Sequence, residues 1–195
     1  MTPTRDMSNG WEAVTNEFIA IREQSDIGVD VVQAWARNLP NGCAVLDIGC
    51  GTGIPVAQAL VADGFEIYGV DASPTMVAEF QQRFPKASVA CEPVEASAFF
   101  DRSFDGIVAI GLIFLLPAAI QRQLIFAVAS ALNSGGHFLF TSPAQVCEWA
   151  DLMTGRKSRS LGQDAYARLL AEAGLVLVRS YVDAGENRYF HAQRP

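Results

Sequence analysis

Hydrophobic and polar positions follow two patterns along this chain. One pattern predicts helices and the other predicts strands. Before residue 43 the apolar residues recur at spacings of three and four, which is typical of amphipathic helices. The first stripe consists of Trp11, Val14, Phe18 and Ile21. A second stripe runs from Val29 to Leu39, and Gly28 separates the two. We therefore expect residues 1–42 to form an N-terminal helical cap.

After residue 43, short apolar runs alternate with helical stripes. The runs predict buried strands at residues 44–48, 65–70, 87–91, 106–111 and 137–141. The stripes predict helices at residues 54–63, 76–84, 118–132 and 164–173. Residues 175–181 and 188–192 are expected to form a terminal hairpin. Strands that alternate with helices predict an α/β fold, a three-layer αβα sandwich with a mostly parallel sheet.

The first predicted strand runs directly into a glycine-rich turn. Gly49, Gly51 and Gly53 follow an apolar run whose one carboxylate is Asp47. Glycine permits backbone angles that other residues resist, and its missing side chain lets a ligand approach the main chain. The next helix would point its free N–H groups at that ligand, which favours a carboxylate or a phosphate.

The spacing of these glycines discriminates between known nucleotide-binding loops. A dinucleotide fingerprint needs Gly or Ala at the sixth position counted from Gly49, where this chain has Ile54. A Walker loop needs Gly-Lys-Ser/Thr, which does not follow Gly53. The second predicted strand is followed by Asp71, at the spacing where nucleotide-binding sheets place a ribose carboxylate. An ordinary turn aspartate is the structural alternative for Asp71.

Two segments resemble a known family. Asp-Ile-Gly-Cys-Gly-Thr-Gly at residues 47–53 is similar to the first motif of class I S-adenosylmethionine (SAM)-dependent methyltransferases of the small-molecule type. Gly-Val-Asp-Ala-Ser-Pro-Thr-Met at residues 69–76 is similar to the same family's G-x-D-x-S-x-x-M stretch. The resemblance extends from Val45 to the C-terminus. It implies a seven-stranded sheet with an antiparallel C-terminal strand, and transfer of a methyl group from SAM that leaves S-adenosylhomocysteine.

The resemblance also implies a set of cofactor-binding residues. They are Asp47, Gly49, Cys50, Gly51, Gly53, Asp71, Ala72, Met76, Val94, Gly111 and Arg22. Arg22 would reach the cofactor carboxylate, while Trp11 and Phe18 would wall the site. The alternative is a solvated charge for Arg22 and core packing for the two aromatic residues.

Residues 92–95 stand where the family reads adenine. Pro93 has no N–H to give, so we expect the N–H of Val94 to act together with Glu92 or Glu95. Met76 either packs inside its helix or touches the adenine ring.

The end of the fourth predicted strand should border the transferred methyl group. Gly111, Leu112 and Phe114 lie there, and the stretch offers only apolar residues. This argues against a DNA-amine or protein-amide acceptor and favours a small, partly apolar molecule. Deprotonation of the acceptor by one of several nearby residues is conceivable, and the sequence does not choose among them. These residues are Glu148, Asp151, Tyr189 and His191.

Residues 143–162 break the alternation of strands and helices. In the resembling family this place holds an insertion that contacts the substrate. Here it includes Trp149 and the basic residues Arg156, Lys157 and Arg159, the one basic concentration in the chain. A solvated loop and a contact for an anionic substrate are equally good interpretations.

Composition limits the number of domains and the classes of partner that we expect. The 195 residues suit one domain, and the net charge of −7 disfavours nucleic-acid binding. The four cysteines show no metal-ligand spacing, which predicts free thiols and no metal. The N-terminus lacks the apolar core of a signal peptide, and the longest apolar stretch is too short to span a bilayer. We expect a cytoplasmic protein that binds no membrane, with its oligomeric state left open.

Three other function classes share parts of the pattern. A nicotinamide-dependent oxidoreductase would share the sheet and Asp71, but Ile54 breaks its fingerprint. A non-catalytic SAM-binding protein would keep the glycines and Asp71 without an open acceptor cavity. A thiol hydrolase that uses Cys50 would need a histidine, and no histidine is placed by sequence to activate it.

Overall fold

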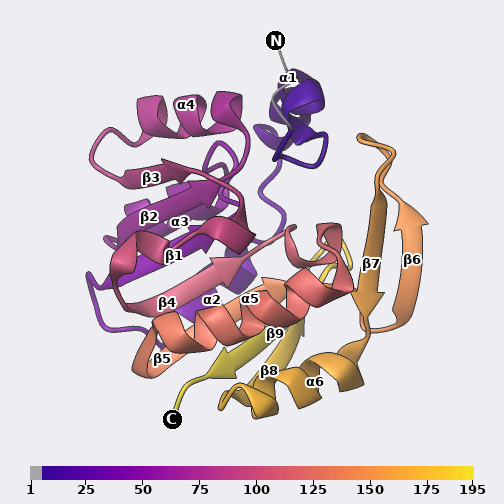
Figure 1. Cartoon of the computed structure of the whole chain (residues 1–195). Coiled ribbons are helices and arrows are strands. Elements are labelled where there is room, and N and C mark those ends of the chain that lie inside the picture. The colour runs from indigo at the N-terminus through magenta and orange to yellow at the C-terminus, as the bar shows by residue number, and fades with distance from the viewer. Residues whose placement is uncertain (1–5) are drawn as a thin grey trace.

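The computed structural model describes residues 6–195 and contains a seven-stranded sheet with helices on both faces (Figure 1). The strand order is β3-β2-β1-β4-β5-β9-β8, and β6 and β7 form a separate two-stranded sheet. The strands are β1 (Ala44–Ile48), β2 (Glu66–Asp71), β3 (Ser88–Cys91), β4 (Phe104–Ala109), β5 (Leu132–Thr141), β6 (Val146–Ala150), β7 (Lys157–Leu161), β8 (Val176–Val182) and β9 (Arg188–Gln193).

Six α-helices and three short 3-10 helices accompany these strands in the described part of the chain. The α-helices are α1 (Trp11–Arg22), α2 (Val29–Ala36), α3 (Val56–Ala62), α4 (Pro74–Arg83), α5 (Ala118–Ala131) and α6 (Gln163–Glu172). The 3-10 helices are η1 (Val94–Ala96), η2 (Phe99–Asp101) and η3 (Ile113–Leu115).

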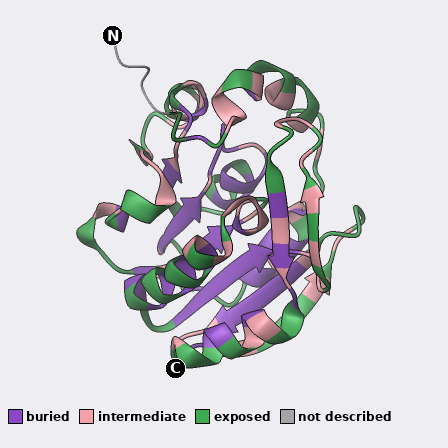
Figure 2. Ribbon diagram, turned by 45° about the vertical axis from the view of Figure 1, so that its right-hand side comes forward, coloured by how far each residue is buried: buried purple, intermediate pink, exposed green. Residues whose placement is uncertain are grey.

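Two hydrophobic cores lie on opposite faces of the sheet. One core packs α5 and α6 against β4, β5 and β9, with Tyr166 and Phe140 among its fully buried side chains. The other packs α2, α3 and α4 against β1 and β4, around Trp35 and Phe80. Figure 2 shows the central strands buried between these layers. The three-layer αβα sandwich predicted from the alternation of elements is confirmed.

The directions of the strands show which edge of the sheet can hold a ligand. β1 pairs in parallel with both β2 and β4, and β5 pairs in parallel with β4. The antiparallel partner of β5 is the C-terminal strand β9, as the resemblance implies. Because the order of strands reverses between β1 and β4, the carboxyl ends of these two strands border a natural ligand crevice.

Residues 133–136, which the sequence analysis leaves between the helix predicted at 118–132 and the strand predicted at 137–141, are part of β5. Leu132 pairs with Phe104, and the register then jumps to His137 opposite Gly106, so the residues between form a bulge. Arg194 supplies the missing backbone partners, since its carbonyl accepts the N–H of Gly135 at 2.7 Å and its N–H donates to Gly136 at 2.9 Å. This start of β5 was not predicted because these partners come from the far end of the chain.

The segment predicted as an irregular insertion contains the hairpin of β6 and β7. Trp149 of β6 packs against Phe114 with ring centroids 5.5 Å apart. On β7, Ser158 and Ser160 are buried, and the hydroxyl of Ser160 donates to the carbonyl of Pro143 at 2.6 Å. The hairpin stands beside the sheet, as Figure 1 shows, and β7 contacts η3. Neither strand shows the apolar–polar alternation by which strands are recognised, since β6 is apolar apart from Glu148 and β7 is polar apart from Leu161.

The structure also describes the cysteines and the length of the helices. All four cysteines are free thiols. Within residues 6–195 no helix has the length and apolar character needed to cross a membrane.

Two glycines with similar backbone angles test how tightly the glycine turn packs. A Cβ at Gly53 (φ +81°) would lie 2.4 Å from Cε2 of Phe84, whereas at Gly64 (φ +89°) nothing lies within 4 Å. We predict that Gly64→Ala costs about 1 kcal/mol of unfolding free energy, and that Gly53→Ala costs about 2–4 kcal/mol because overpacking adds to backbone strain. Urea denaturation measures both, and equal losses would show that the turn repacks freely.

Candidate functional site

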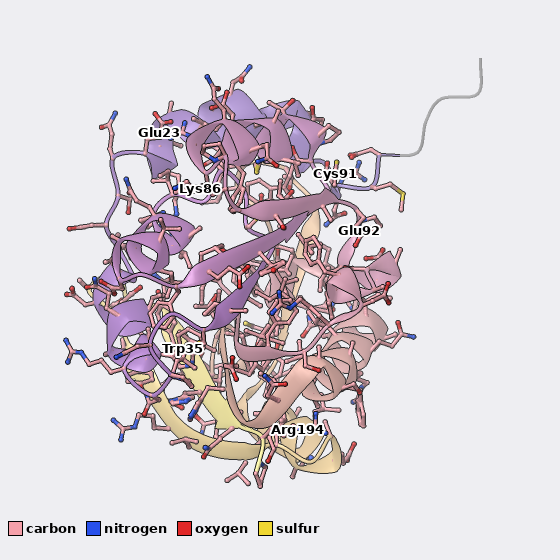
Figure 3. All side chains as sticks on the ribbon, turned by 90° about the vertical axis from the view of Figure 1, so that its left-hand side faces the viewer. Glu23, Trp35, Lys86, Cys91, Glu92 and Arg194 are labelled. Carbon is pink, nitrogen blue, oxygen red and sulfur yellow. The ribbon has the colours of Figure 1, made fainter. Side chains whose placement is uncertain are left out.

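A cavity of about 360 Å³ opens where the central strands end. Its floor comes from the segments that follow β1, β2, β3, β4 and β5, which include Gly49, Asp71, Glu92 and Gly111. Helix α1 supplies one wall, and η3 together with the hairpin residue Asp151 supplies another. Figure 3 shows Glu92 at the end of β3, directly after Cys91. The cavity therefore lies at the crevice that the strand order predicts.

Asp71 links two turns of the cavity floor. Its Oδ2 accepts the N–H of Gly51 at 2.9 Å, and its Oδ1 accepts the N–H of Ser73 at 2.8 Å. Burial raises the pKa of Asp71, while these backbone hydrogen bonds oppose the rise. Each carboxylate oxygen can accept a further hydrogen bond, so Asp71 can still receive ligand hydroxyls from the cavity side.

The glycine turn is held against β2 by its own backbone. The N–H groups of Gly49 and Cys50 both donate to the carbonyl of Val70, at 2.7 and 3.1 Å. Gly49 and Gly51 have φ angles of +72° and +53°, in the region that favours glycine. Both glycines line the cavity, whereas α3 contributes no residue to its described wall. We had expected the N-terminus of that helix to face the ligand, and the turn takes this position instead.

Asp47 lies behind this turn, with 2 % of its surface exposed. Burial, with a smaller contribution from the charge of Asp71, raises the pKa of Asp47 to about 7, and Arg22 opposes this rise. Burial lowers the pKa of Arg22, and the nearby Tyr189, Asp183 and Asp47 oppose that decrease. A buried acid and a partly buried base thus share one end of the site.

Helix α1 turns one stripe of side chains toward the cavity. The stripe has the helical spacings four, three and four, through Trp11, Thr15, Phe18 and Arg22. Trp11, Phe18 and Arg22 line the cavity, and the rings of Trp11 and Phe18 meet edge to face at 5.1 Å. The structure therefore favours the cavity-wall interpretation of these residues over core packing and a solvated charge.

Eight of the eleven residues expected to bind the cofactor line the cavity. They are Arg22, Gly49, Gly51, Asp71, Ala72, Met76, Val94 and Gly111. Asp47, Cys50 and Gly53 are not part of the described cavity wall. The thiol of Cys50 packs in the core, with its pKa raised mainly by burial, and Gly53 faces Phe80 and Phe84. Any ligand contact from Cys50 or Gly53 would use the backbone, and a thiol nucleophile at Cys50 is disfavoured.

The four candidate bases divide into two pairs. Asp151 and Tyr189 line the cavity, whereas Glu148 and His191 do not. His191 is buried in a hydrogen bond with His137 at 2.8 Å, and burial lowers its pKa to about 4. Glu148 is exposed and pairs with Lys157 at 3.1 Å. His191 and Glu148 are therefore poorly placed to act on a ligand in this cavity.

The two candidates in the cavity wall are already engaged. Asp151 Oδ1 accepts hydrogen bonds from the N–H of Met153 and from both the N–H and the hydroxyl of Thr154. The hydroxyl of Tyr189 donates to Asp183 at 2.8 Å, and burial together with this carboxylate raises the pKa of Tyr189. Tyr189 is therefore a poor base at neutral pH.

Several cavity residues escaped the sequence analysis. Ser8, Asn9, Ile27 and Asn187 come from turns without a distinguishing motif. Thr141 follows the fifth strand at the functional edge of the sheet, where its hydroxyl accepts the N–H of Gly111 at 2.7 Å. The rule that ligands bind beyond the carboxyl ends of parallel strands would have found Thr141. No group of three or more potential metal ligands occurs within residues 6–195.

Comparison with known proteins identifies the central part of the chain. Residues 45–136 match the family model described as "Methyltransferase domain". Human Methyltransferase-like protein 27 is 32% identical over 91 residues, which cover 44% of this chain and 36% of that protein. The matched segment thus spans about a third of the length of this relative.

Solved structures share the fold over nearly the whole chain. One belongs to the complex between the Haloferax volcanii Trm112 methyltransferase activator and a methyltransferase, with a TM-score of 0.76, 18% identity, and coverage of 98% of this chain and 99% of that chain. Another is SAM-bound CalS10, an amino pentose methyltransferase from Micromonospora echinaspora, with a TM-score of 0.71, 17% identity, and coverage of 92% and 97%.

The domain match covers the glycine turn and Asp71, and the fold neighbours cover the whole sheet around them. Residues 45–136 are thus similar to a methyltransferase domain, and the chain shares its fold with S-adenosylmethionine-dependent methyltransferases.

Proposed function

We propose that this chain binds SAM in the cavity and transfers its methyl group to a small acceptor molecule. The observation that carries the proposal is Asp71, a carboxylate in the cavity wall held by the N–H groups of Gly51 and Ser73. A carboxylate fixed in this way can accept hydrogen bonds from two adjacent ribose hydroxyls. The residues after β3 are then placed to meet the adenine ring.

The charges around the cavity also suit SAM. The carboxylates of Asp71, Glu92 and Glu95 line the cavity, and Asp47 lies directly behind its floor. SAM carries a sulfonium, an ammonium and a carboxylate, so its net charge is positive. The effective dielectric constant in a partly buried site is lower than in water, so its carboxylates attract such a cation more strongly than they would in bulk solvent. Arg22 is the cavity-wall cation that we assign to the cofactor carboxylate.

One buried donor in the cavity wall lacks a partner. Among the described atoms, Nε1 of Trp11 is buried and makes no hydrogen bond. Such groups are rare in folded proteins because each one costs about 1–3 kcal/mol. We take this indole N–H as support for a ligand acceptor atom under helix α1.

The cofactor supplies an electrophilic methyl group, so the protein needs mainly to align the acceptor and to exclude water. Gly111 and Leu112 border the place where the methyl group should lie, and the rings of Phe114 and Phe18 shield the cavity from solvent. Tyr189 is a poor base, whereas Asp151 accepts its hydrogen bonds through Oδ1 alone, so we infer that Asp151 is the candidate base that remains in the described cavity wall.

The acceptor side of the cavity favours a small molecule with an apolar body. Ile110, Leu112, Phe114, Leu115 and Leu116 make up much of this wall. The basic residues of the hairpin offer little to an anionic acceptor, since Lys157 and Arg159 both pair with Glu148. CalS10 is an amino pentose methyltransferase, so the shared fold accommodates a small acceptor of this class. We propose residues 6–42 as the cofactor cap and residues 143–162 as the acceptor-side insertion. Residues 1–5 of the cap expected from the sequence lie outside the described residues.

Calorimetric titration with SAM, S-adenosylhomocysteine and NADH tests the proposed cofactor. We predict micromolar binding of the first two ligands and no signal from NADH. Asp71→Ala should weaken binding of S-adenosylhomocysteine by about 1–3 kcal/mol, because two ribose hydroxyls lose a charged partner. The exposed Asp30 provides the matched control, and Asp30→Ala should bind like the wild type.

Two results would refute this cofactor site. Binding of NADH alone would assign the glycine turn to an oxidoreductase. Unchanged affinity in a folded Asp71→Ala variant would remove the ribose role from Asp71.

Asp47 generates a prediction about stability and pH. Its pKa is about 7 in the folded protein, above the ordinary value of 3.8, so folding takes up a proton between these two pH values. Stability contributed by this group is therefore lost as the pH rises from about 4 to about 7. Asp47→Asn removes this loss, and we predict that its stability advantage over wild type grows by about 2–3 kcal/mol between pH 5 and pH 8.

Urea denaturation at the two pH values measures this difference, with Asp30→Asn as the exposed control. A difference between Asp47→Asn and wild type that stays constant with pH would show that Asp47 is ionised in the folded protein throughout this range.

A further inference from the structure

Helix α1 forms a wall of the cavity although it contributes almost nothing to the hydrophobic cores. Of its twelve residues, all of them described, only Thr15 is buried. Its stripe of Trp11, Phe18 and Arg22 faces the cavity instead of a core. Since apolar burial does not fasten this helix, other interactions must hold it over the site.

Glu12 attaches the first turn of α1 to α4, while at the other end of α1 its C-cap Glu23 pairs with Arg83 of α4. The Oε2 of Glu12 accepts the hydroxyl of Ser73 at 2.5 Å and the N–H of Thr75 at 3.2 Å. Its Oε1 accepts the hydroxyl of Thr75 at 2.5 Å. These hydrogen bonds, that from Ser73 first, lower the pKa of Glu12, so the carboxylate is ionised at neutral pH.

The attachment point is the first turn of α4. Ser73 is the N-cap of that helix, and its hydroxyl oxygen also accepts the N–H of Met76 at 3.2 Å. A carboxylate at a helix N-terminus is stabilised by free N–H groups and by the helix dipole. Thr15, one turn after Glu12, adds a contact between its hydroxyl and that of Ser73 at 3.3 Å.

Ser73 also joins this attachment to Asp71. Its backbone N–H donates to Asp71 Oδ1 at 2.8 Å, while its hydroxyl donates to Glu12. Ser73 is fully buried, so these bonds are shielded from water. One residue therefore fixes the position of the cavity wall relative to the carboxylate that we assign to ribose.

We propose that Glu12 is a positioning residue of the cofactor site, which fastens α1 across the cavity by clamping Ser73 and Thr75. The proposal rests on the proposed function of the cavity. Glu12 does not belong to the described cavity wall and acts through α1, which carries Trp11, Phe18 and Arg22 to the ligand. Loss of the clamp should release this wall and leave the sheet intact.

The test combines calorimetric titration with S-adenosylhomocysteine and amide hydrogen exchange of the free protein. Glu12→Ala should weaken binding at least tenfold, and Glu12→Gln, which keeps one acceptor oxygen, should weaken it less. Amide exchange should accelerate in residues 11–22 of Glu12→Ala and stay unchanged in β1, β4 and β5. Exposed Glu17, on the same helix, supplies the control, and Glu17→Ala should match wild type in both measurements.

A partner variant shows whether the effect travels through the clamp. Thr75→Val removes one hydroxyl donor at nearly constant shape and should weaken binding too. Because the two residues share one interaction, the double variant Glu12→Ala/Thr75→Val should bind no worse than about twofold below Glu12→Ala.

Three results would overturn the proposal in distinguishable ways. Wild-type affinity in a folded Glu12→Ala protein would refute the role of Glu12 alone. Faster exchange spread over the whole sheet would show that Glu12 merely stabilises the fold. Absence of any binding by the wild-type protein would refute the proposed function, and the positioning role with it.

Discussion

The carboxylate of Asp71 is the contact on which the site depends. It accepts one N–H from the turn after β1 and another from the turn after β2, and it thereby joins the two loops through a side chain, in addition to the backbone hydrogen bonds to Val70. Ser73, one of the two donors, also bonds to Glu12 of α1. A few hydrogen bonds around Asp71 therefore fix the relative positions of three parts of the site: the glycine turn, the start of α4 and helix α1.

This arrangement concentrates negative charge in a buried place. Burial raises the pKa of both Asp47 and Asp71, and the charge of Asp71 raises the pKa of Asp47 further. Arg22 offsets part of the charge. A hydrophobic residue at position 47 would pack in the sheet at lower electrostatic cost, so the acid makes sense as an attractor for a cationic ligand. We infer that the buried acids lower the folding stability of the free protein and that a bound cationic ligand recovers part of this cost.

Local chemistry explains which features were predictable. The glycines at 49, 51 and 53 and the acid at position 71 are required by the backbone path itself, and their spacing is visible in the sequence. The apolar runs of the central strands are equally local signals. Trp11 and Phe18 are different, because an apolar stripe on a helix looks the same whether it faces a core or a ligand cavity.

Other features depend on residues distant in the sequence. Neither strand of the β6–β7 hairpin alternates apolar with polar residues, and Trp149 of the hairpin packs against the distant Phe114. The bulged start of β5 is completed by Arg194, about sixty residues later. Glu12 was overlooked for the same reason, since its partners Ser73 and Thr75 are brought to it only by the packing of α1 on α4.

The central claim is that Asp71 receives the ribose of the cofactor inside this cavity. A crystal structure of the protein with S-adenosylhomocysteine tests it most directly. We predict that both ribose hydroxyls lie within hydrogen-bond distance of the Asp71 carboxylate, and that the amino-acid end of the ligand lies beside Gly49 and Arg22. Ligand density at another place, or a ribose that does not contact Asp71, would contradict it.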